Sequence, residues 1–218
     1  KAYLSALGTM GRKHLKALIK VGCLVEACDP NINAFEIAKS ELIQAGLDYK
    51  KFVRVEKPYG RYDFAIFSET ASSRLNNFKY FLDHAFAHKI LLEKPLSANP
   101  SEFEVFIQLA EEKGVEDCIQ VNLVRRLWDH ITIINEYCKN EDDFVMTING
   151  GAIGLGCNGI HYLDNFILFS GNEMPVVKWV QLSKNLVKSG RGKQFYDYGG
   201  NFVIETSKGT LMASITAN

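Results

Sequence analysis

The stretch "SALGTMGRKH", residues 5–14, lies almost at the start of the chain and is the strongest indication of its fold. It follows a short strand-like run, residues 1–6, and opens a segment with apolar residues at helical spacing. Gly8 and Gly11 are spaced like the last two glycines of the pattern G-x-G-x-x-G, whereas Ala6 stands where the first glycine is expected. A loop of this kind presents backbone N–H groups to a phosphate at the start of a helix.

An acidic residue further along supports a dinucleotide-binding loop over an ordinary β–α turn whose glycines serve packing. Asp29 ends the next strand-like run, "LVEACD". A carboxylate there accepts hydrogen bonds from the adenosine ribose and repels a 2′-phosphate, which favours NAD over NADP. Gly8 is expected to let a phosphate approach the backbone, and Gly11 to let the helix pack on the strand. Ala6 fits the tight turn if its φ angle is negative. The loop from Gly8 through Thr9 and Met10 to Gly11 is therefore the expected cofactor loop.

The first half of the chain alternates apolar runs with helical patterns. Strands are predicted at residues 1–6, 24–29, 61–69, 89–94 and 118–123, and helices at 11–22, 33–46, 73–85 and 99–114. This alternation predicts an α/β, doubly wound parallel sheet of the Rossmann type. In the last of these helices, Asn99 is the expected N-cap, Pro100 the first helical residue and Glu102 the partner of a capping box.

The pattern changes after about residue 124. Helices are predicted at residues 126–139 and 160–171, and strands at 143–149, 176–184, 200–209 and 210–217, with a turn at Lys208 and Gly209. Strands with few helices between them predict a mostly antiparallel open sheet. The expected organisation is a Rossmann domain, residues 1–124, followed by an α+β domain, residues 125–218.

The charge balance and the cysteine spacing exclude several classes of function. The 25 basic and 25 acidic residues balance, which predicts neither a nucleic-acid nor a membrane-surface partner. No apolar run is long enough to span a membrane. The five cysteines are irregularly spaced and include no C-x-x-C pair, so we expect neither a metal site nor a redox dithiol. Free thiols and the absence of a signal-peptide pattern predict a cytoplasmic protein.

Three stretches together resemble a known family. They are "LGTMGRKH" at residues 7–14, "LLEKPLS" at 91–97 and "GLGCNGIHYLDNF" at 154–166. In order and spacing they are similar to motifs of the glucose-fructose oxidoreductase, inositol dehydrogenase and MocA-like family. The resemblance implies an NAD(P)-dependent dehydrogenase or reductase that transfers a hydride between nicotinamide and a hydroxyl or ketone. It further implies a sugar, cyclitol or nucleotide-linked sugar as substrate, and a homodimer or homotetramer formed through the C-terminal sheet.

The resemblance also assigns roles to residues. Lys94 matches the E-K-P lysine, which touches the nicotinamide side and the substrate hydroxyl, and Glu93 and a cis Pro95 shape that loop. His161 matches the catalytic histidine, which can take the hydroxyl proton. Asp164, three residues later, either orients His161 or stabilises local structure.

Further positions are assigned with alternatives. Ser68 and Thr70 are expected beside the cofactor, although Glu69 stands where the family has a proline. Arg125 or Arg126 is expected near the substrate. His14 is expected to bind locally. Three other histidines are placed on helices and exposed to solvent: His84, His88 and His130.

Cys157 is the main departure, because many members have an aspartate there. Asn158 can supply polar contacts to the substrate instead. The change indicates a different substrate, a weaker proton relay or lost activity. The alternatives to a sugar dehydrogenase are therefore a regulatory NAD-binding protein and a reductase of a non-sugar carbonyl or imine. The chain is also shorter than most members, which indicates a fragment or a compact variant.

Overall fold

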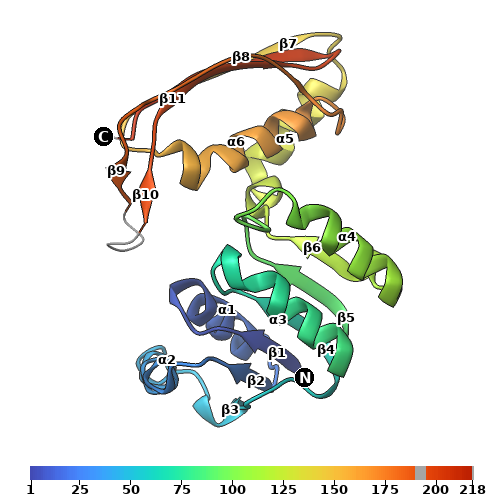
Figure 1. The fold of residues 1–218 in the computed structure, drawn as a ribbon, viewed down its shortest axis with the longest axis vertical. Coiled ribbons are helices and arrows are strands. Elements are labelled where there is room, and N and C mark those ends of the chain that lie inside the picture. The colour runs from blue at the N-terminus through green and yellow to red at the C-terminus, as the bar shows by residue number, and fades with distance from the viewer. Residues whose placement is uncertain (190–194, 218) are drawn as a thin grey trace. The chain divides into compact units, whose positions relative to one another are not determined.

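The computed structural model describes residues 1–189 and 195–217. The chain divides into two compact units, Lys1–Asn122 and Leu123–Asn218, each of which combines a sheet with helices (Figure 1).

Unit 1 contains a parallel sheet of six strands in the order β3-β2-β1-β4-β5-β6. The strands are β1 (Ala2–Ser5), β2 (Val25–Cys28), β3 (Phe52–Arg54), β4 (Gly60–Phe67), β5 (Ala85–Leu92) and β6 (Ile119–Val121). The helices are α1 (Thr9–Lys20), α2 (Ile32–Gln44), α3 (Ala71–His84) and α4 (Glu102–Lys113), with short 3-10 turns at Tyr49–Lys51 and Glu116–Cys118. The direction of winding reverses between β1 and β4, and a crevice for ligands forms at such a point.

Two apolar clusters make unit 1 a doubly wound fold, as predicted. Leu4 on β1 packs with Leu15 of α1 and Phe35 of α2 on one face of the sheet. Phe67 on β4 packs with Phe78 of α3 and, through the same cluster, with residues of α4 on the other face. Because successive side chains of a strand point to opposite faces, both faces of each central strand are covered.

Four local predictions in unit 1 are wrong. The sheet has a sixth strand, β3, which is too short to produce a recognisable alternation of apolar and polar residues. His88 lies on β5 and not on a helix, because α3 ends at His84 and the strand begins directly after it. The capping box is absent, since the Glu102 carboxylate accepts from the Ser97 hydroxyl and not from the Asn99 amide. Helix α4 begins at Glu102 with Ser101 as its N-cap, so neither Asn99 nor Pro100 has its predicted place. The Asn99 side chain accepts from the Ser101 amide within the preceding turn.

Unit 2 contains a four-stranded sheet in the order β7-β12-β11-β8. The strands are β7 (Phe144–Gly150), β8 (Val176–Leu182), β11 (Gly200–Glu205) and β12 (Gly209–Ile215). The pairs β8–β11 and β11–β12 are antiparallel, whereas β12 and β7 are parallel. A separate antiparallel pair joins β9 (Val187–Lys188) to β10 (Tyr196–Asp197). The sheet is therefore mostly antiparallel, as predicted, with one parallel pair.

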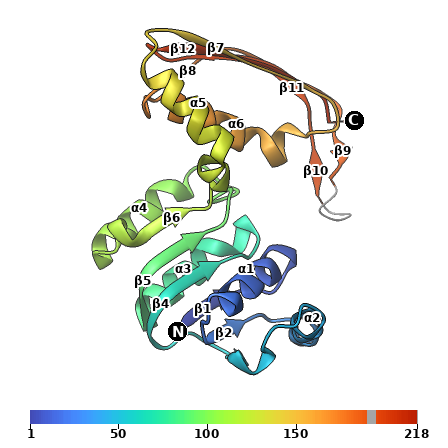
Figure 2. The ribbon, with the colours of Figure 1, turned by 180° about the vertical axis from the view of Figure 1, so that it is seen from behind.

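The helices of unit 2 are α5 (Asp129–Lys139) and α6 (Leu155–Phe169), preceded by a 3-10 turn at Val124–Leu127. Both lie on the same side of the sheet (Figures 1 and 2). Phe166 of α6 is fully buried against Phe202 and Leu211 of the sheet. Helix α6 begins at Leu155, inside the glycine-rich stretch, and not at Ile160 as predicted. In residues 1–189 and 195–217, no helix combines the length and apolarity that a bilayer crossing requires.

Candidate functional site

The glycine loop joins β1 to α1, and its first position differs from the prediction. Ala6 has a φ angle of +67°, so the condition under which alanine fits this turn without strain is not met. The neighbouring strands impose this conformation, because the Ala6 amide donates to Cys28 O over 2.8 Å and Ala6 O accepts from Ser68 Oγ over 2.9 Å. A residue with a Cβ atom in this region carries strain of about 1 kcal/mol or more.

Ala6→Gly is therefore expected to increase the free energy of unfolding by about 1 kcal/mol, because relief of strain exceeds the added chain entropy of glycine. Urea unfolding followed by circular dichroism measures the change. Ala27→Gly, at a buried site in β2 outside the left-handed region, is the control and should destabilise. Equal destabilisation by both variants would contradict the assignment of strain to Ala6.

The other two glycines of the loop differ in their surroundings. A Cβ atom added to Gly11 would lie 2.1 Å from Ala6 O and 2.7 Å from Ser68 Oγ, so α1 approaches the strand ends as closely as it can. A Cβ atom added to Gly8 would meet nothing within 4 Å. The backbone at Gly8 therefore faces open space into which a phosphate could come.

Asp29 is held against the glycine loop. Its Oδ2 accepts from the Leu7 amide over 2.6 Å and its Oδ1 from the Asn31 amide over 2.7 Å. These bonds fix the carboxylate at the end of β2 and leave further lone pairs for ribose hydroxyls. Asp29 thus also shapes the loop, a structural role that the sequence pattern did not reveal.

A cleft of about 730 Å³ lies at the carboxyl ends of β1, β2 and β4. Four of the predicted cofactor residues line it: Gly8, Asp29, Ser68 and Thr70. The other five are not among its lining residues: Thr9, Met10, Gly11, Glu93 and Lys94. The volume and the apolar and polar lining suit a cofactor of dinucleotide type.

Three charged residues that line this cleft have no predicted role there: Arg54, Glu56 and Glu69. Glu69 lines it, and burial raises the pKa of its carboxyl group. Arg54 also lines it, at the end of the overlooked strand β3. A guanidinium near the ribose can accommodate a 2′-phosphate, so Arg54 opposes the preference for NAD that Asp29 confers.

The E-K-P loop follows β5, and its Lys94–Pro95 peptide bond is cis. Glu93 is 5% exposed; its Oε1 lies 2.7 Å from His14 Nε2 and accepts from Asn122 Nδ2 over 2.7 Å. Burial pushes the pKa of Glu93 upward, but the bonds from His14 and Asn122 outweigh it, and the net shift is downward. His14 thus binds locally, at the base of the loop that carries Lys94.

In unit 2, α6 carries His161, which is 6% exposed. Asp164 on the same helix accepts from Arg126 Nε through both oxygens, at 2.7 and 2.8 Å. Burial raises the pKa of Asp164 against the opposing effect of Arg126. This pairing favours a structural role for Asp164 over orientation of His161. It also means that the guanidinium of Arg126 is already bound to a carboxylate.

Arg125 has different surroundings. Its guanidinium lies over the rings of Trp128 and Tyr162, at 5.4 and 5.1 Å from their centroids, and Nη2 is 3.5 Å from Asn158 Oδ1. Of the two arginines, Arg125 is therefore the one without a carboxylate partner in the described part of unit 2.

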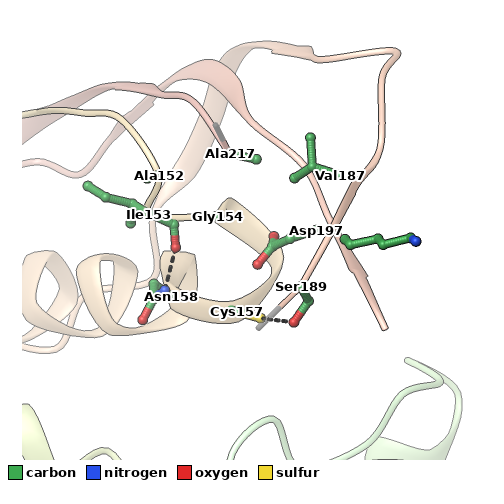
Figure 3. A pocket seen from close by; sticks show the side chains of 10 residues that line it. Ala152, Ile153, Gly154, Cys157, Asn158, Val187, Ser189, Asp197 and Ala217 are labelled. Atoms are coloured by element: carbon green, nitrogen blue, oxygen red, sulfur yellow. Dashed lines mark hydrogen bonds between the residues drawn. The ribbon is translucent and has the colours of Figure 1, made fainter. Parts of the chain in front are cut away.

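A pocket of about 280 Å³ beside Cys157 contains a carboxylate that sequence reasoning missed (Figure 3). Asp197 of β10 is 5% exposed, and its Oδ1 accepts from the amides of Gly156 and Tyr198 over 2.8 and 2.9 Å. Cys157 Sγ lies 3.8 Å from Ser189 Oγ in the same pocket. Asp197 caps α6 and explains why the helix begins early. The sequence indicates this contact only through two glycines: a Cβ atom would lie 2.1 Å from Asp197 Oδ2 at Gly154 and 3.0 Å from Asp197 Oδ1 at Gly156.

No protein-family model and no curated protein sequence matches the chain. Solved structures are similar over nearly its whole length. The dehydrogenase MviM from Clostridium difficile has 14% identity and a TM-score of 0.67, with 100% of this chain and 70% of that chain covered. The myo-inositol dehydrogenase from Lactobacillus casei, in complex with NAD(H) and myo-inositol, has 14% identity and a TM-score of 0.73, with 99% and 66% covered.

The WlbA dehydrogenase from Thermus thermophilus, in complex with NAD and UDP-GlcNAcA, has 19% identity and a TM-score of 0.63, with 100% and 73% covered. The chain has the fold of these dehydrogenases, as the resemblance of its sequence motifs implies. It spans roughly two thirds of the length of these structures, 66% of the inositol dehydrogenase for example.

Proposed function

We propose that the chain is an NAD-dependent oxidoreductase acting on a hydroxyl or ketone of a sugar, cyclitol or nucleotide-linked sugar. The observation that carries the proposal is the cleft at the carboxyl ends of β1, β2 and β4. There a glycine loop, a fixed carboxylate at Asp29 and the hydroxyls of Ser68 and Thr70 surround one space. This arrangement matches what a dinucleotide requires of a Rossmann fold.

The residues fit the cofactor in chemical terms. The open backbone at Gly8 and the N-terminus of α1 would receive the pyrophosphate, and Asp29 would accept from the ribose hydroxyls. Bound NAD would supply the site that accepts or returns the hydride. Two neighbouring structures of the same fold contain NAD or NAD(H).

Four residues are proposed to act on the substrate. Lys94, half-buried after β5, would donate a hydrogen bond to the substrate oxygen as charge develops on it. His161 would take the proton of the substrate hydroxyl. Arg125 and Asn158 would bind further polar groups of the substrate, because they lie together on unit 2 and present a guanidinium and an amide.

The test is to incubate the protein with NAD and a panel of sugars, cyclitols and nucleotide-linked sugars and to follow the absorbance of the reduced cofactor. Lys94→Ala is expected to lower turnover by about a hundredfold or more, because a donor to the developing charge is lost. Its affinity for NAD, measured by calorimetry, should change by less than about threefold. Lys89→Ala, on the exposed part of β5, is the matched control. Unchanged turnover in Lys94→Ala would refute the role of Lys94.

Cys157 gives one specific reason to keep a second candidate, a regulatory NAD-binding protein. A neutral thiol does not support a proton relay as a carboxylate does. Binding of NAD without turnover of any sugar would favour this candidate. Turnover of a carbonyl or imine compound outside the sugars would instead favour a reductase of non-sugar substrates.

We also propose that copies of the chain associate through the sheet of unit 2 in the cytoplasm. Every residue of β8 is exposed, and large apolar side chains are among them, including Trp179 and Leu182. Light scattering on the purified protein should show a dimer or tetramer that Trp179→Glu dissociates. A monomer at micromolar concentration would contradict the proposed association.

A further inference from the structure

One arginine of unit 1 is buried from solvent and makes its hydrogen bonds to backbone carbonyl groups. Arg74 lies in the first turn of α3 and is 2% exposed. Its guanidinium donates to four backbone carbonyl oxygens and to no carboxylate oxygen among the described residues. A buried arginine normally pairs with an acid, so an all-carbonyl set of acceptors indicates a special purpose.

The four acceptors belong to two loops. Nη2 donates to Glu69 O over 2.5 Å, in the loop after β4. The two hydrogens of Nη1 face three carbonyl oxygens in the loop after β5, so that one hydrogen is shared: Glu93 O at 2.5 Å, Pro95 O, and Leu96 O at 3.0 Å. One side chain therefore ties together the two loops that follow neighbouring strands of the sheet.

Lys94 lies between two of these acceptors. The carbonyl groups of Glu93 and Pro95, one on each side of it, point at the same nitrogen of Arg74. Carbonyl oxygens that converge on one point repel each other unless a cation stands between them. Only a guanidinium carries enough donors, in a rigid fork, to satisfy both loops at once.

Two nearby carboxylates favour the charged form of Arg74. Burial moves the pKa of Arg74 below its usual value, and the carboxylates of Glu69 and Glu93 act in the opposite direction. Glu93 is itself fixed by Asn122 and by its contact with His14. The E-K-P loop is thus held from its carbonyl side by Arg74 and from the Glu93 side chain by a second set of contacts.

We propose that Arg74 is a positioning residue that fixes the backbone of Lys94 and couples it to the loop of Ser68, Glu69 and Thr70 in the cofactor cleft. The catalytic meaning of this role rests on the proposed function. The structural coupling itself does not, because it can be measured without substrate or NAD.

The experiment compares Arg74→Ala and Arg74→Lys with the wild-type protein by hydrogen–deuterium exchange resolved to residues 93–97. Arg74→Ala should raise the exchange rate of this segment about tenfold or more, with β1 and α1 little changed. Millimolar guanidinium should restore slow exchange, whereas urea, which has a similar shape and no charge, should not. Arg61→Ala, which removes an exposed arginine of β4, should leave the segment unchanged.

The proposal is overturned if exchange of residues 93–97 stays slow in Arg74→Ala, or if urea restores it as well as guanidinium does. If Arg74→Ala does not fold, Arg74→Lys decides: faster local exchange in a folded protein supports the fork, and wild-type exchange overturns it. Unfolding of both variants also overturns it, since Arg74 would then support the whole unit.

The wild-type protein separates this proposal from the proposed function. If it turns over a substrate, Arg74→Ala should lower kcat about tenfold or more at nearly unchanged affinity for NAD, with recovery in guanidinium. If the wild-type protein binds no NAD, the proposed function fails while the exchange experiment still tests the role of Arg74.

Discussion

Gly11→Ala is expected to destabilise unit 1 by about 3 kcal/mol and to abolish binding of NAD. The added methyl group would lie 2.1 Å from Ala6 O and 2.7 Å from Ser68 Oγ. Ala6 O cannot retreat, because it accepts from Ser68 Oγ while the Ala6 amide is bonded to Cys28 O. The start of α1 must therefore move away from the strands, and the amides proposed to bind the phosphate move with it. Urea unfolding by circular dichroism and calorimetric titration with NAD measure the two effects.

Gly8→Ala is the matched control for this result. Gly8 has a φ angle of −62°, which alanine adopts freely, and its Cβ atom would meet nothing within 4 Å. Stability should change by less than about 0.5 kcal/mol. Affinity for NAD should still fall, because the methyl group would occupy the space proposed for the phosphate. A Gly11→Ala protein as stable as wild type, or a Gly8→Ala protein with full affinity, would contradict this account of the loop.

Asp197→Ala is expected to destabilise unit 2 by about 2 kcal/mol, because two backbone amides lose the partly buried carboxylate that accepts from them. These are the N–H groups of Gly156 and Tyr198, which both donate to Asp197 Oδ1. The lost carboxylate also faced the positive end of α6. The only two tryptophans, Trp128 and Trp179, belong to unit 2, so tryptophan fluorescence during urea unfolding reports this unit selectively.

A double-mutant cycle sharpens this prediction. Gly154→Ala should destabilise strongly by itself, since its Cβ atom would lie 2.1 Å from Asp197 Oδ2 and its φ angle is +71°. Once Asp197 is alanine, the clash disappears, and the second substitution should add at least about 1 kcal/mol less than it does in the wild-type protein. Asp129→Ala, at an exposed site in α5, is the control and should have little effect. Additive effects of Gly154→Ala and Asp197→Ala would refute the contact.

The doubly wound unit was predictable because its signals are local. Leu15, Leu18 and Ile19 repeat at helical spacing, and all three are buried in α1. Three residues of β3 cannot show a period, so that strand and Arg54 at its end were overlooked. The positive φ angle of Ala6 was not predictable, because bonds to β2 and to Ser68, both distant in sequence, impose it.

In the candidate site, too, the features with a local sequence signal were predictable and the long-range contacts were not. The motif residues lie on the elements where the pattern placed them, with Lys94 after β5 and His161 on α6. The residues that hold those elements were not visible in the sequence. Arg74 and Asp197 form hydrogen bonds with backbone groups, which the sequence letters do not distinguish. Apart from Tyr198, which directly follows Asp197, their partners lie 5 to 41 residues away. Long-range contacts to main-chain atoms are therefore what the sequence alone could not reveal.

The parallel pair of β7 and β12 has a consequence for how the chain is made. Phe144 of β7 lies beside Gly209 of β12. The first strand of this sheet therefore has no pairing partner until β12 has been synthesised. During synthesis on a ribosome, Lys1–Asn122 can acquire all its strand neighbours before Phe144–Gly150 has any. The nascent chain then carries a paired sheet followed by an apolar strand without a partner, and an unpaired strand of this kind is prone to aggregation.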